Sequence, residues 1–321
     1  MARLVVVGAG ISGLAAAWAA RHTAARAGVA LDVIVLERGA GVGGKARTIV
    51  RDGWMVEGGP SGFLSGRPEL DALIEAAGLT GQLLPARTAA KRRFIFRAGR
   101  MRELKVSPVG LAASGLLGAG GLLRLAAEPF VARATSGVDE SVWAFAARRL
   151  GVQAADRLVS PATLGVFAGD AKRLSMTSAF PKMAALEREH GSLVRGMIAR
   201  RRGARARLTS LRDGMQSLPR ALAATGGFAV RCNADVRAIV RTPRGWSVAM
   251  EGDGTLLDAD AIVIAAEPFA AAQLLRPLAP SAADALDAIP CPPVTVGALG
   301  YAAEAAAAIP DGFGVLVSRG E

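Results

Sequence analysis

Two short apolar runs near the N-terminus set the pattern of the first part of the chain. The first is Leu4 to Val7, and the second is Leu31 to Leu36, which carries a single acid at Asp32. Short runs of this kind, rich in valine and isoleucine, are typical of strands that are buried on both faces of a parallel sheet. A glycine-rich turn and a helix-length segment separate the two runs. The pattern therefore predicts a strand–helix–strand unit at the start of the chain.

Three glycines after the first strand give this unit its chemistry. They are Gly8, Gly10 and Gly13, in the GxGxxG spacing. Gly8 permits a tight turn, Gly10 lets the backbone approach a pyrophosphate, and Gly13 lets the following helix pack closely on the sheet. The helix begins near Ile11 and Ser12, so its free N–H groups and the positive end of its dipole face the phosphates. The loop therefore predicts a dinucleotide as the ligand.

An acid at the end of the second strand completes the unit. Glu37 lies 24 positions after Gly13, close to the interval at which a carboxylate meets the ribose of a nucleotide. Arg38, the next residue, is assigned to the same site. A secretory signal peptide is the alternative, because Arg3, the apolar run and Trp18-Ala19-Ala20 resemble one with its cleavage site. The glycine spacing and the position of the acid favour the nucleotide unit.

A second glycine loop, soon after the second strand, favours a flavin over a nicotinamide. It contains Gly43 and Gly44, followed by Lys45, Arg47 and Thr48. A simple NAD domain would continue from its acid into a helix, whereas this loop offers backbone amides and two cations to a dinucleotide phosphate. A mobile glycine hinge with solvated cations is the alternative.

A third glycine turn follows an expected strand within residues 53–63. It reads Gly58-Gly59-Pro60-Ser61, where the backbone can run close to a ring system. In this order, the two glycine loops, the strand ending in an acid and the E-G-G-P turn resemble the flavin-dependent amine oxidase superfamily, which includes protoporphyrinogen oxidases and carotenoid desaturases. The resemblance implies FAD as the cofactor. Its expected contacts are the residues named above in the first two glycine loops, Glu37 with Arg38, and the third turn at Gly58, Gly59, Pro60 and Ser61.

Two motifs in the middle of the chain narrow the resemblance to the protoporphyrinogen oxidases. Residues 93–100 are similar to the strand of that family that reads R-F-hydrophobic-aromatic and ends in a glycine turn. Residues 165–170 read G-V-F-A-G-D, like the family's signature, and residues 174–192 continue it with elements similar in order and spacing. Taken alone, the signature has a strained loop between helices as its alternative interpretation.

The resemblance implies the oxidation of protoporphyrinogen IX, or of coproporphyrinogen III, with hydride passed to the flavin and electrons passed on to oxygen. Arg93 matches the family's propionate-binding arginine, and a guanidinium suits a carboxylate because it offers a fork of donors. Phe167, Gly169 and Leu316 match the apolar wall against the tetrapyrrole. A surface arginine on a strand edge is the alternative for Arg93, and ordinary packing is the alternative for the other three.

The chain after residue 212 is expected to return to the nucleotide domain. Residues 213–219 resemble the family's G-G-x-x-x-L-P element, with Asp213 in place of the first glycine. Residues 230–239 alternate as one strand would. The resemblance implies that the backbone of Val236 meets the adenine, and a core valine is the equal alternative. Residues 245–257 predict a hairpin.

Three further strands are expected towards the C-terminus. Residues 261–266 predict a buried strand whose end brings Ala265 and Ala266 near the dinucleotide. Residues 294–301 predict a second strand. Residues 311–317 resemble a substrate-domain strand of the same family.

The patterns predict an α/β fold, and the resemblance implies its parts: a Rossmann-like FAD-binding domain of the amine-oxidase (GR2) type, a mixed-sheet α+β substrate domain and a helical, membrane-associating insertion. The expected domains are an FAD-binding domain at residues 1–86 and 213–284, an incomplete substrate domain at 87–97 and 285–321, and the insertion at 98–212. Family members continue into further substrate-domain strands and a final flavin-binding segment. We therefore expect a chain that is C-terminally truncated relative to the family.

Composition limits the other chemistry. With 321 residues, of which 51% are hydrophobic, the chain can bury the cores of more than one domain. Cys232, Cys291 and the two histidines are too few for a disulfide framework or a metal cluster, and both cysteines are expected in the core. No acid–base constellation emerges, which agrees with a flavin that carries the chemistry.

The formal net charge of +12 predicts an anionic partner. A solvated face and an anionic membrane surface are the two interpretations of an arginine-dense region, and the insertion of the resembled family favours the membrane. This region lacks interleaved aromatic residues, so nucleic acid is not expected. Residues 106–123 are uncharged but rich in glycine, which favours an interfacial helix over a membrane span. The crowded arginines are Arg195, Arg200, Arg201, Arg202, Arg205, Arg207 and Arg212.

The expected location is cytoplasmic and peripheral to the inner membrane, and a homodimer stays open. Two other functions also stay open. A carotenoid desaturase or amine oxidase would share the N-terminal flavin motifs but lack the G-V-F-A-G-D signature. An inactive flavin-binding or membrane-binding fragment would explain a chain that stops inside the substrate domain. The sequence does not distinguish the two porphyrinogens.

Overall fold

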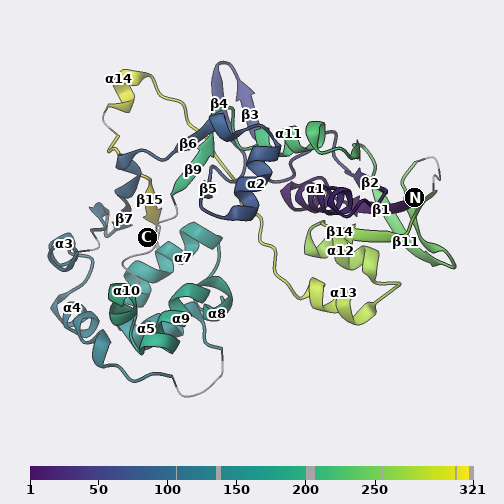
Figure 1. Ribbon diagram of the computed structural model, residues 1–321. Coiled ribbons are helices and arrows are strands. Elements are labelled where there is room, and N and C mark those ends of the chain that lie inside the picture. Colours follow the sequence, from purple (N-terminus) through teal and green to yellow (C-terminus); the bar gives the residue numbers. More distant parts are fainter. Residues whose placement is uncertain are drawn as a thin grey trace. The chain divides into compact units, whose positions relative to one another are not determined.

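The computed structural model describes residues 1–105, 107–134, 139–199, 207–252, 254, 256–307 and 309–317. These residues form two compact units, each built from two stretches of the chain (Figure 1). Unit 1 comprises Met1–Ala86 and Ala206–Gly300, and unit 2 comprises Arg87–Arg205 and Tyr301–Glu321. The chain therefore leaves unit 1 after residue 86, returns to it at residue 206 and leaves it again after residue 300.

A four-stranded parallel sheet forms the centre of unit 1 (Figure 1). In its register, Leu4 is opposite Val33 on one side and Ala261 on the other. The strands β1 and β2 confirm the two predicted apolar strands, and the helix α1 (Ile11–Arg26) connects them. The strand order is β10-β2-β1-β14, with β1 at Ala2–Val7, β2 at Leu31–Leu36, β10 at Ala229–Arg231 and β14 at Ala261–Ile264.

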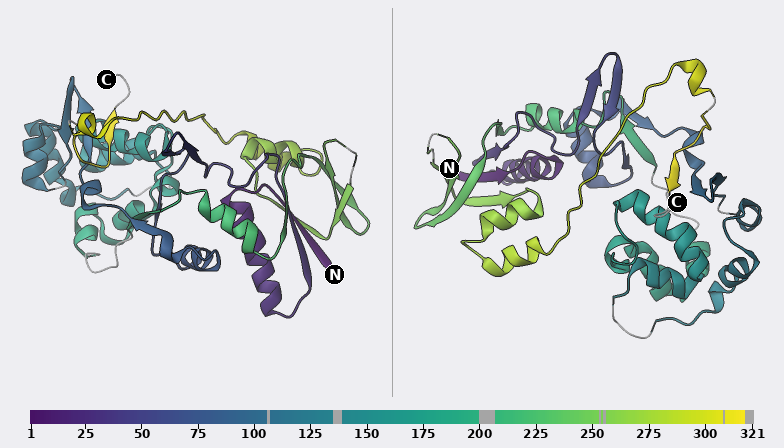
Figure 2. Two further views of the ribbon diagram at one scale, coloured as in Figure 1. Left: turned by 90° about the horizontal axis from the view of Figure 1, so that it is seen from above. Right: turned by 180° about the vertical axis from the view of Figure 1, so that it is seen from behind.

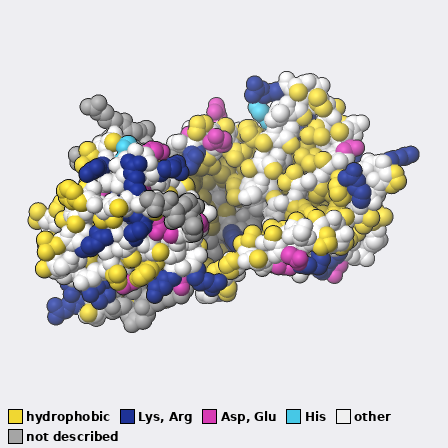
Figure 3. Space-filling model, turned by 90° about the horizontal axis from the view of Figure 1, so that it is seen from below, with side chains coloured by type: hydrophobic (Ala, Val, Ile, Leu, Met, Phe, Trp, Pro, Cys, Tyr) yellow, Lys and Arg dark blue, Asp and Glu magenta, His cyan; other side chains and the backbone are white. Residues whose placement is uncertain are grey.

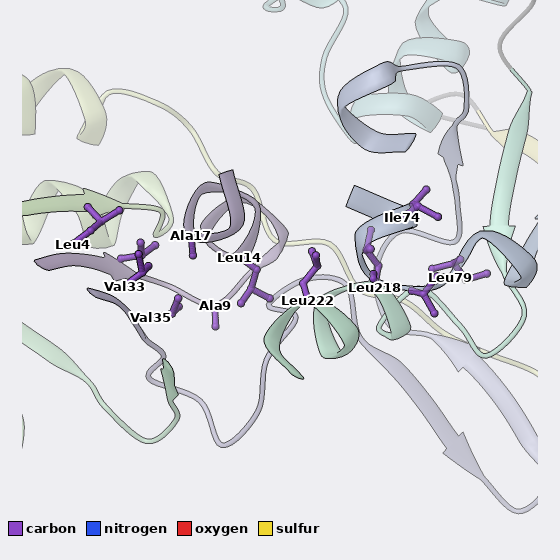
Figure 4. Packing of buried hydrophobic residues seen from close by; sticks show 13 residues of the cluster. Leu4, Ala9, Leu14, Ala17, Val33, Val35, Ile74, Leu79, Leu218 and Leu222 are labelled. Carbon is purple, nitrogen blue, oxygen red and sulfur yellow. The ribbon is translucent and has the colours of Figure 1, made fainter. Parts of the chain in front are cut away.

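Alternate residues of β1 and β2 pack into two cores, one on each face of this sheet. Leu4 and Val33 belong to the core that contains α1, α2 (Pro68–Ala76) and α11 (Ser217–Thr225), which Figure 4 shows. Val5 and Ile34 belong to the core on the other face, together with an antiparallel sheet. Burial on both faces explains why the two strands are apolar at nearly every position. The antiparallel sheet has the order β11-β12-β13, with β11 at Val236–Thr242, β12 at Gly245–Met250 and β13 at Leu256–Ala259.

Two small sheets and further helices complete unit 1. The strands β3 and β4 form an antiparallel hairpin, and β9 lies between β5 and β6 in a three-stranded antiparallel sheet. The elements are β3 (Thr48–Arg51), β4 (Trp54–Glu57), β5 (Phe63–Leu64), η1 (Thr80–Gln82), β6 (Leu83–Pro85), β9 (Leu208–Leu211), α12 (Pro268–Leu275) and α13 (Pro280–Asp287). The predicted strand within residues 53–63, the hairpin after residue 245 and the strand after residue 261 are confirmed by β4, by β12–β13 and by β14.

Two other strand predictions are wrong. The single strand expected over residues 230–239 is two strands, β10 and β11, which belong to different sheets. Asn233 between them has a φ of 54°, a turn conformation that asparagine adopts more readily than most residues. The strand expected over residues 294–301 is absent, because residues 291–302 are exposed and have no regular secondary structure. In the described part of the chain, no strand pairs with this segment.

Neither cysteine lies in a core. Cys291 is exposed and Cys232 is half-buried. The prediction that both are core residues is wrong, because Cys232 lies in the turn between β10 and β11 and Cys291 lies in the extended stretch after α13.

Unit 2 consists of short helices and a three-stranded sheet of order β15-β7-β8 (Figure 2). In this sheet β7 pairs with β8 antiparallel and with β15 parallel, so that Leu316 is opposite Ile95. The helix α5 runs from Val142 to Leu150. The other elements are η2 (Thr88–Lys91), β7 (Phe94–Arg97), β8 (Arg100–Glu103), α3 (Pro108–Ser114), α4 (Ala119–Ala126), η3 (Glu128–Phe130), α6 (Val152–Ala154), η4 (Ala155–Val159), α7 (Ser160–Phe167), α8 (Met176–Ala179), α9 (Pro181–His190), α10 (Leu193–Ala199), α14 (Ala303–Ala306) and β15 (Val315–Val317).

Charged side chains are buried among the helices of unit 2. Arg149 and Glu128 are fully buried and form an ion pair. Glu128 also accepts hydrogen bonds from Ser192 Oγ (2.6 Å) and from the N–H of Leu193 (2.9 Å), and Arg149 donates to Glu187 (3.4 Å). Burial acts to raise the pKa of the Glu128 carboxyl, but these hydrogen bonds outweigh it and hold the pKa below its ordinary value. The network thus joins η3, α5, α9 and the start of α10 through charged groups.

The chain passes between the two units at residues 86–87, 205–206 and 300–301. The three domains expected from the sequence stay a prediction, and their boundary at residue 97 falls in the turn of the β7–β8 hairpin.

Within the described residues, no helix combines the length and the apolar character needed to cross a membrane. The uncharged stretch that begins at residue 106 contributes instead to two short helices, α3 and α4. Four of the crowded arginines, Arg200, Arg201, Arg202 and Arg205, lie outside the described residues.

Candidate functional site

Unit 1 has a cavity of about 640 Å³ at the carboxyl ends of β1, β2 and β14. Cavities of about 300–1,000 Å³ are typical of small-molecule and cofactor sites, and parallel sheets place their ligands at this edge. Most of the residues predicted to bind the cofactor meet here. They are Gly8, Gly10, Ile11, Ser12, Glu37, Arg38, Gly43, Gly44, Lys45, Pro60, Val236, Ala265 and Ala266.

In the first loop, a different steric demand explains the glycine at each of the three positions. Gly8 has a φ of 105°, and a Cβ there would lie 2.7 Å from the carbonyl oxygen of Ala265. A Cβ at Gly13 would lie 1.9 Å from the carbonyl oxygen of Gly8, so only glycine lets α1 pack this closely. A Cβ at Gly10 would meet no protein atom within 4 Å, and Gly10 lines the cavity. The space beside Gly10 therefore fits a diphosphate that approaches the backbone.

The start of α1 adds the charge that a diphosphate requires. The first N–H groups of a helix lack acceptors within the helix, and Ile11 and Ser12, the first two residues of α1, line the cavity. No acidic side chain lies in the first turn of α1. The positive end of the helix dipole is therefore left for an anionic ligand.

The second glycine loop lies directly against the first. The N–H of Gly43 donates to the carbonyl of Ala9 (2.8 Å), and a Cβ at Gly44 would lie 3.3 Å from Gly10 Cα. Gly59 in the third turn also packs against the second loop, because a Cβ there would lie 1.9 Å from the carbonyl oxygen of Lys45. Close packing of the second loop on its two neighbours therefore brings residues far apart in the sequence to one side of the cavity.

The Glu37 carboxylate is held by backbone groups. Its Oε2 accepts from the N–H of Ala9 (2.8 Å) and its Oε1 accepts from the N–H of Gly39 (2.8 Å). Each carboxylate oxygen can accept a second hydrogen bond. Glu37 is thus fixed at the cavity and retains the capacity to accept ribose hydroxyls, as predicted from its place after β2.

Six predicted cofactor residues lie outside the cavity lining. Thr48 belongs to a structural network, because its Oγ1 donates to Glu57 (3.0 Å) and its N–H donates to the side chain of Gln216 (3.2 Å). Gln216 in turn donates to the carbonyl of Val42 (2.9 Å), which fixes the second loop. The six residues, whose direct roles in cofactor binding stay predictions, are Gly13, Arg47, Thr48, Gly58, Gly59 and Ser61.

The cavity is also lined by residues that the sequence patterns did not indicate. Glu267 forms an ion pair with Lys45, and Arg237 forms ion pairs with Asp235 (3.1 Å) and Glu251. The one available signal for Glu267 was its place at the end of a strand, directly before the proline that begins α12. The lining residues of this group are Ala234, Asp235, Arg237, Glu267, Pro268, Phe269, Ala270, Gln273 and Leu274.

The predicted substrate residues lie in unit 2. The Arg93 guanidinium is exposed and lies 5.5 Å from the centre of the Phe313 ring, a cation–π contact. Its neighbour Arg92 is bound instead by Glu103 (3.1 Å) and by the carbonyl of Asp311 (3.2 Å). The hydrogen bond from Arg92 holds the pKa of the Glu103 carboxyl below its usual value. Of these two arginines, Arg93 is the one in contact with an aromatic ring and without a carboxylate partner among the described residues.

The apolar substrate residues are brought together in part. Leu316 on β15 packs against Gly165 of α7, where an added Cβ would lie 2.3 Å from its Cδ2. Phe167, two residues further along α7, is exposed and makes an edge-to-face contact with Phe180 at 5.3 Å. Gly169 packs on Leu174 instead. Leu316 and the signature of residues 165–170 therefore meet at Gly165, and their roles toward a substrate stay predictions.

The parallel sheet with helices on one face, the two glycine loops and the cavity at the strand ends define a dinucleotide-binding protein of the Rossmann-like class. The model of the family of flavin-containing amine oxidoreductases matches residues 11–320, and the chain belongs to this family. FAD is the cofactor that this membership implies, and the glycine geometry of the cavity fits its diphosphate.

Similar proteins come from plants and bacteria. A chloroplastic protoporphyrinogen oxidase of Oryza sativa subsp. japonica is 33% identical over 94% of this chain and 59% of its own length. A coproporphyrinogen III oxidase of Bacillus subtilis is 27% identical over 86% of this chain and 62% of its own length. The crystal structure of a protein named "Putative protoporphyrinogen oxidase" from Exiguobacterium sp. 255-15 matches with a TM-score of 0.72 and 26% identity, over 85% of this chain and 61% of its own. The chain thus spans about three fifths of the length of these relatives.

Proposed function

We propose that this chain binds FAD in the cavity of unit 1 and belongs to an oxidase that converts a porphyrinogen to the corresponding porphyrin. The observation that carries the proposal is the meeting of both glycine loops at one cavity in a chain whose relatives are named protoporphyrinogen oxidase and coproporphyrinogen III oxidase. The substrate is protoporphyrinogen IX or coproporphyrinogen III, which differ in their number of carboxylates.

The residues of unit 1 hold the cofactor. The N–H groups of Ile11 and Ser12 bind the diphosphate, and Glu37 accepts hydrogen bonds from the ribose hydroxyls. Lys45 contributes a positive charge close to the diphosphate. The flavin, when bound, supplies the chemistry by accepting a hydride from the substrate.

The residues of unit 2 hold the substrate. Arg93 binds a propionate carboxylate through its guanidinium fork, because its guanidinium has only the Phe313 ring as a partner among the described residues. Leu316 and Phe167 give apolar surface to the tetrapyrrole ring. Leu316 packs on Gly165 of α7, and Phe167 is the last residue of the same helix. With each hydride that the flavin accepts, the substrate also releases one proton to the solvent.

The test is the oxygen-dependent appearance of porphyrin fluorescence from each porphyrinogen, with purified FAD-loaded protein. We expect Arg93→Ala to raise the KM for porphyrinogen by about tenfold or more, which corresponds to the loss of one charge-assisted hydrogen-bonded contact. Arg100→Ala, an exposed arginine in the same hairpin, is the matched control and keeps the wild-type KM. The flavin content of both variants should equal that of the wild type.

Two outcomes would contradict this proposal. Flavin-loaded protein that oxidises neither porphyrinogen refutes the assigned reaction, and oxidation of a primary amine or a carotenoid instead identifies another branch of the superfamily. An unchanged KM in Arg93→Ala refutes the role of Arg93 alone. Porphyrin formation that continues without oxygen refutes oxygen as the electron acceptor.

Binding to an anionic membrane surface is part of the same proposal. The net charge of +12 supports it, and Lys and Arg side chains are spread over the face of unit 2 in Figure 3. On the segment from α3 to η3, Val109, Leu123 and Phe130 are 81%, 73% and 85% exposed. Co-sedimentation with phosphatidylglycerol vesicles, lost at high salt and absent with phosphatidylcholine, is the expected result. The homodimer is tested on the same preparation by sedimentation velocity.

A further inference from the structure

One ion pair in the lining of the unit 1 cavity joins two segments that are far apart in the sequence. Lys45 lies in the second glycine loop and Glu267 lies directly before α12, and both line the cavity. The Lys45 Nζ is 2.9 Å from one carboxylate oxygen of Glu267 and 3.1 Å from the other. A single ammonium group therefore engages both oxygens of the acid.

The position of Glu267 in its own helix makes this geometry informative. Glu267 is the N-cap residue of α12, where a carboxylate commonly accepts hydrogen bonds from the first N–H groups of the helix. Its side chain makes no such bond. The carboxylate extends to Lys45 instead, so the pair stabilises a particular position of the lysine at the expense of a helix cap.

The pair lies beside the place of the diphosphate. Gly44, next to Lys45, packs on Gly10, and Ala265, two residues before Glu267, packs on Gly8. Glu267 and Lys45 thus belong to the two segments that flank the first glycine loop. A carboxylate at this position is unfavourable to a bound diphosphate unless a cation neutralises it.

We propose that Lys45 and Glu267 form a charge clasp, in which Glu267 holds and neutralises Lys45 until a diphosphate takes over its ammonium group. Glu267 is thus a positioning residue that competes with the cofactor's diphosphate for Lys45. The inference rests on the FAD-binding part of the proposed function and is independent of the substrate. It predicts that removing the carboxylate strengthens the binding of any ligand that places a diphosphate at the start of α1.

Because Lys45 and Glu267 are 78% and 37% exposed, solvent weakens their attraction and the effect is moderate. We expect Glu267→Gln to lower the Kd of FAD and of ADP by about threefold to tenfold. Lys45→Met should raise both values. Riboflavin has no phosphate, so its Kd should change by less than about twofold in either variant.

The test titrates the full chain, freed of flavin, with FAD and riboflavin by fluorescence and with ADP by calorimetry. Asp284→Asn is the matched control, because it removes a carboxylate of the same unit that pairs with Arg276 and does not line the cavity. The double variant Lys45→Met/Glu267→Gln completes a cycle. Since the clasp requires both partners, the change caused by Glu267→Gln should be smaller in the Lys45→Met background than in the wild type.

Several results would overturn the clasp. They are weaker or unchanged FAD binding in Glu267→Gln, an equal change for riboflavin, an equal change in Asp284→Asn, and an undiminished effect in the Lys45→Met background. The last result would indicate simple repulsion between Glu267 and the diphosphate. A chain that shows the expected binding pattern but oxidises no porphyrinogen refutes the proposed reaction and leaves the clasp in place, whereas porphyrinogen oxidation without that binding pattern refutes the clasp alone.

Discussion

Replacing Gly10 by alanine should separate cofactor binding from folding. The backbone of Gly10 has a φ of −69° and a ψ of 175°, which alanine adopts without strain, and the added Cβ meets no protein atom within 4 Å. Alanine also restricts the unfolded chain more than glycine does. The free energy of unfolding should therefore stay at the wild-type value or rise by about 0.4–1 kcal/mol.

The same methyl group should weaken FAD binding, because it occupies the space in which the diphosphate approaches the backbone. A charge-assisted hydrogen bond contributes about 1.5–3 kcal/mol, so the loss of one bond to the N–H of Ile11 or Ser12 corresponds to roughly 10-fold to 150-fold in Kd. The assay is a fluorescence titration of the flavin-free chain with FAD, in parallel with urea unfolding. Wild-type affinity in Gly10→Ala would refute the position of the diphosphate, and a clear loss of stability would refute the open space beside Gly10.

Three further predictions concern the fold. Gly13→Ala places a Cβ 1.9 Å from the backbone oxygen of Gly8, so urea unfolding should show a free energy of unfolding that is lower by about 1–3 kcal/mol. A wild-type unfolding midpoint would contradict the close packing. Arg149→Met leaves the Glu128 carboxylate buried without its guanidinium, so thermal and urea unfolding should show a free energy of unfolding that is lower by about 3–5 kcal/mol. A decrease below about 1 kcal/mol would argue against the buried pair. The pKa values of Glu128 and Glu187 are held below the ordinary value of 4.5. Their contribution to the free energy of unfolding is therefore present above about pH 4.5 and is lost as the pH falls through the pKa values of the folded state. A free energy of unfolding that does not change between about pH 6 and pH 3 would contradict this.

The N-terminal wall of the cavity could be predicted from the sequence because its determinants are local. Gly8, Gly10 and Gly13 each meet a steric demand set by the strand and the helix on either side of them. Glu37 ends the next strand, so the spacing alone places it at the same sheet edge. Local geometry of this kind fixes residue types at set spacings, and such spacings can be recognised in the sequence.

The pairing of Lys45 with Glu267 could not be predicted in the same way, because it depends on a contact between distant residues. Glu267 meets Lys45 across 222 positions, and only the pairing of β14 with β1 brings it to the cavity. Arg149 is similar, since an arginine in the last turn of an amphipathic helix is expected at the surface. It is buried because Glu128 and Glu187 reach it from η3 and α9.

The errors in the strand predictions have a related cause. An alternating pattern reports that a segment suits a sheet, but a strand also requires a partner. Residues 294–301 pair with no strand in the described part of the chain. Residues 230–239 alternate across a turn, because Asn233 supplies a positive φ while the residues on either side keep the strand pattern.

The strand order β10-β2-β1-β14 has a consequence for the synthesis of the protein. The first two strands leave the ribosome together, but about 225 residues separate the end of β2 from the start of β14, which pairs with β1. At about 5–20 residues per second, β1 waits roughly 10–45 s for this neighbour. Until β10 and β14 have been synthesised, the two edges of the nascent β1–β2 pair are free to join other chains. Protein yield in cells should therefore depend on chaperones that shield this pair, and FAD can bind only after α12 has emerged.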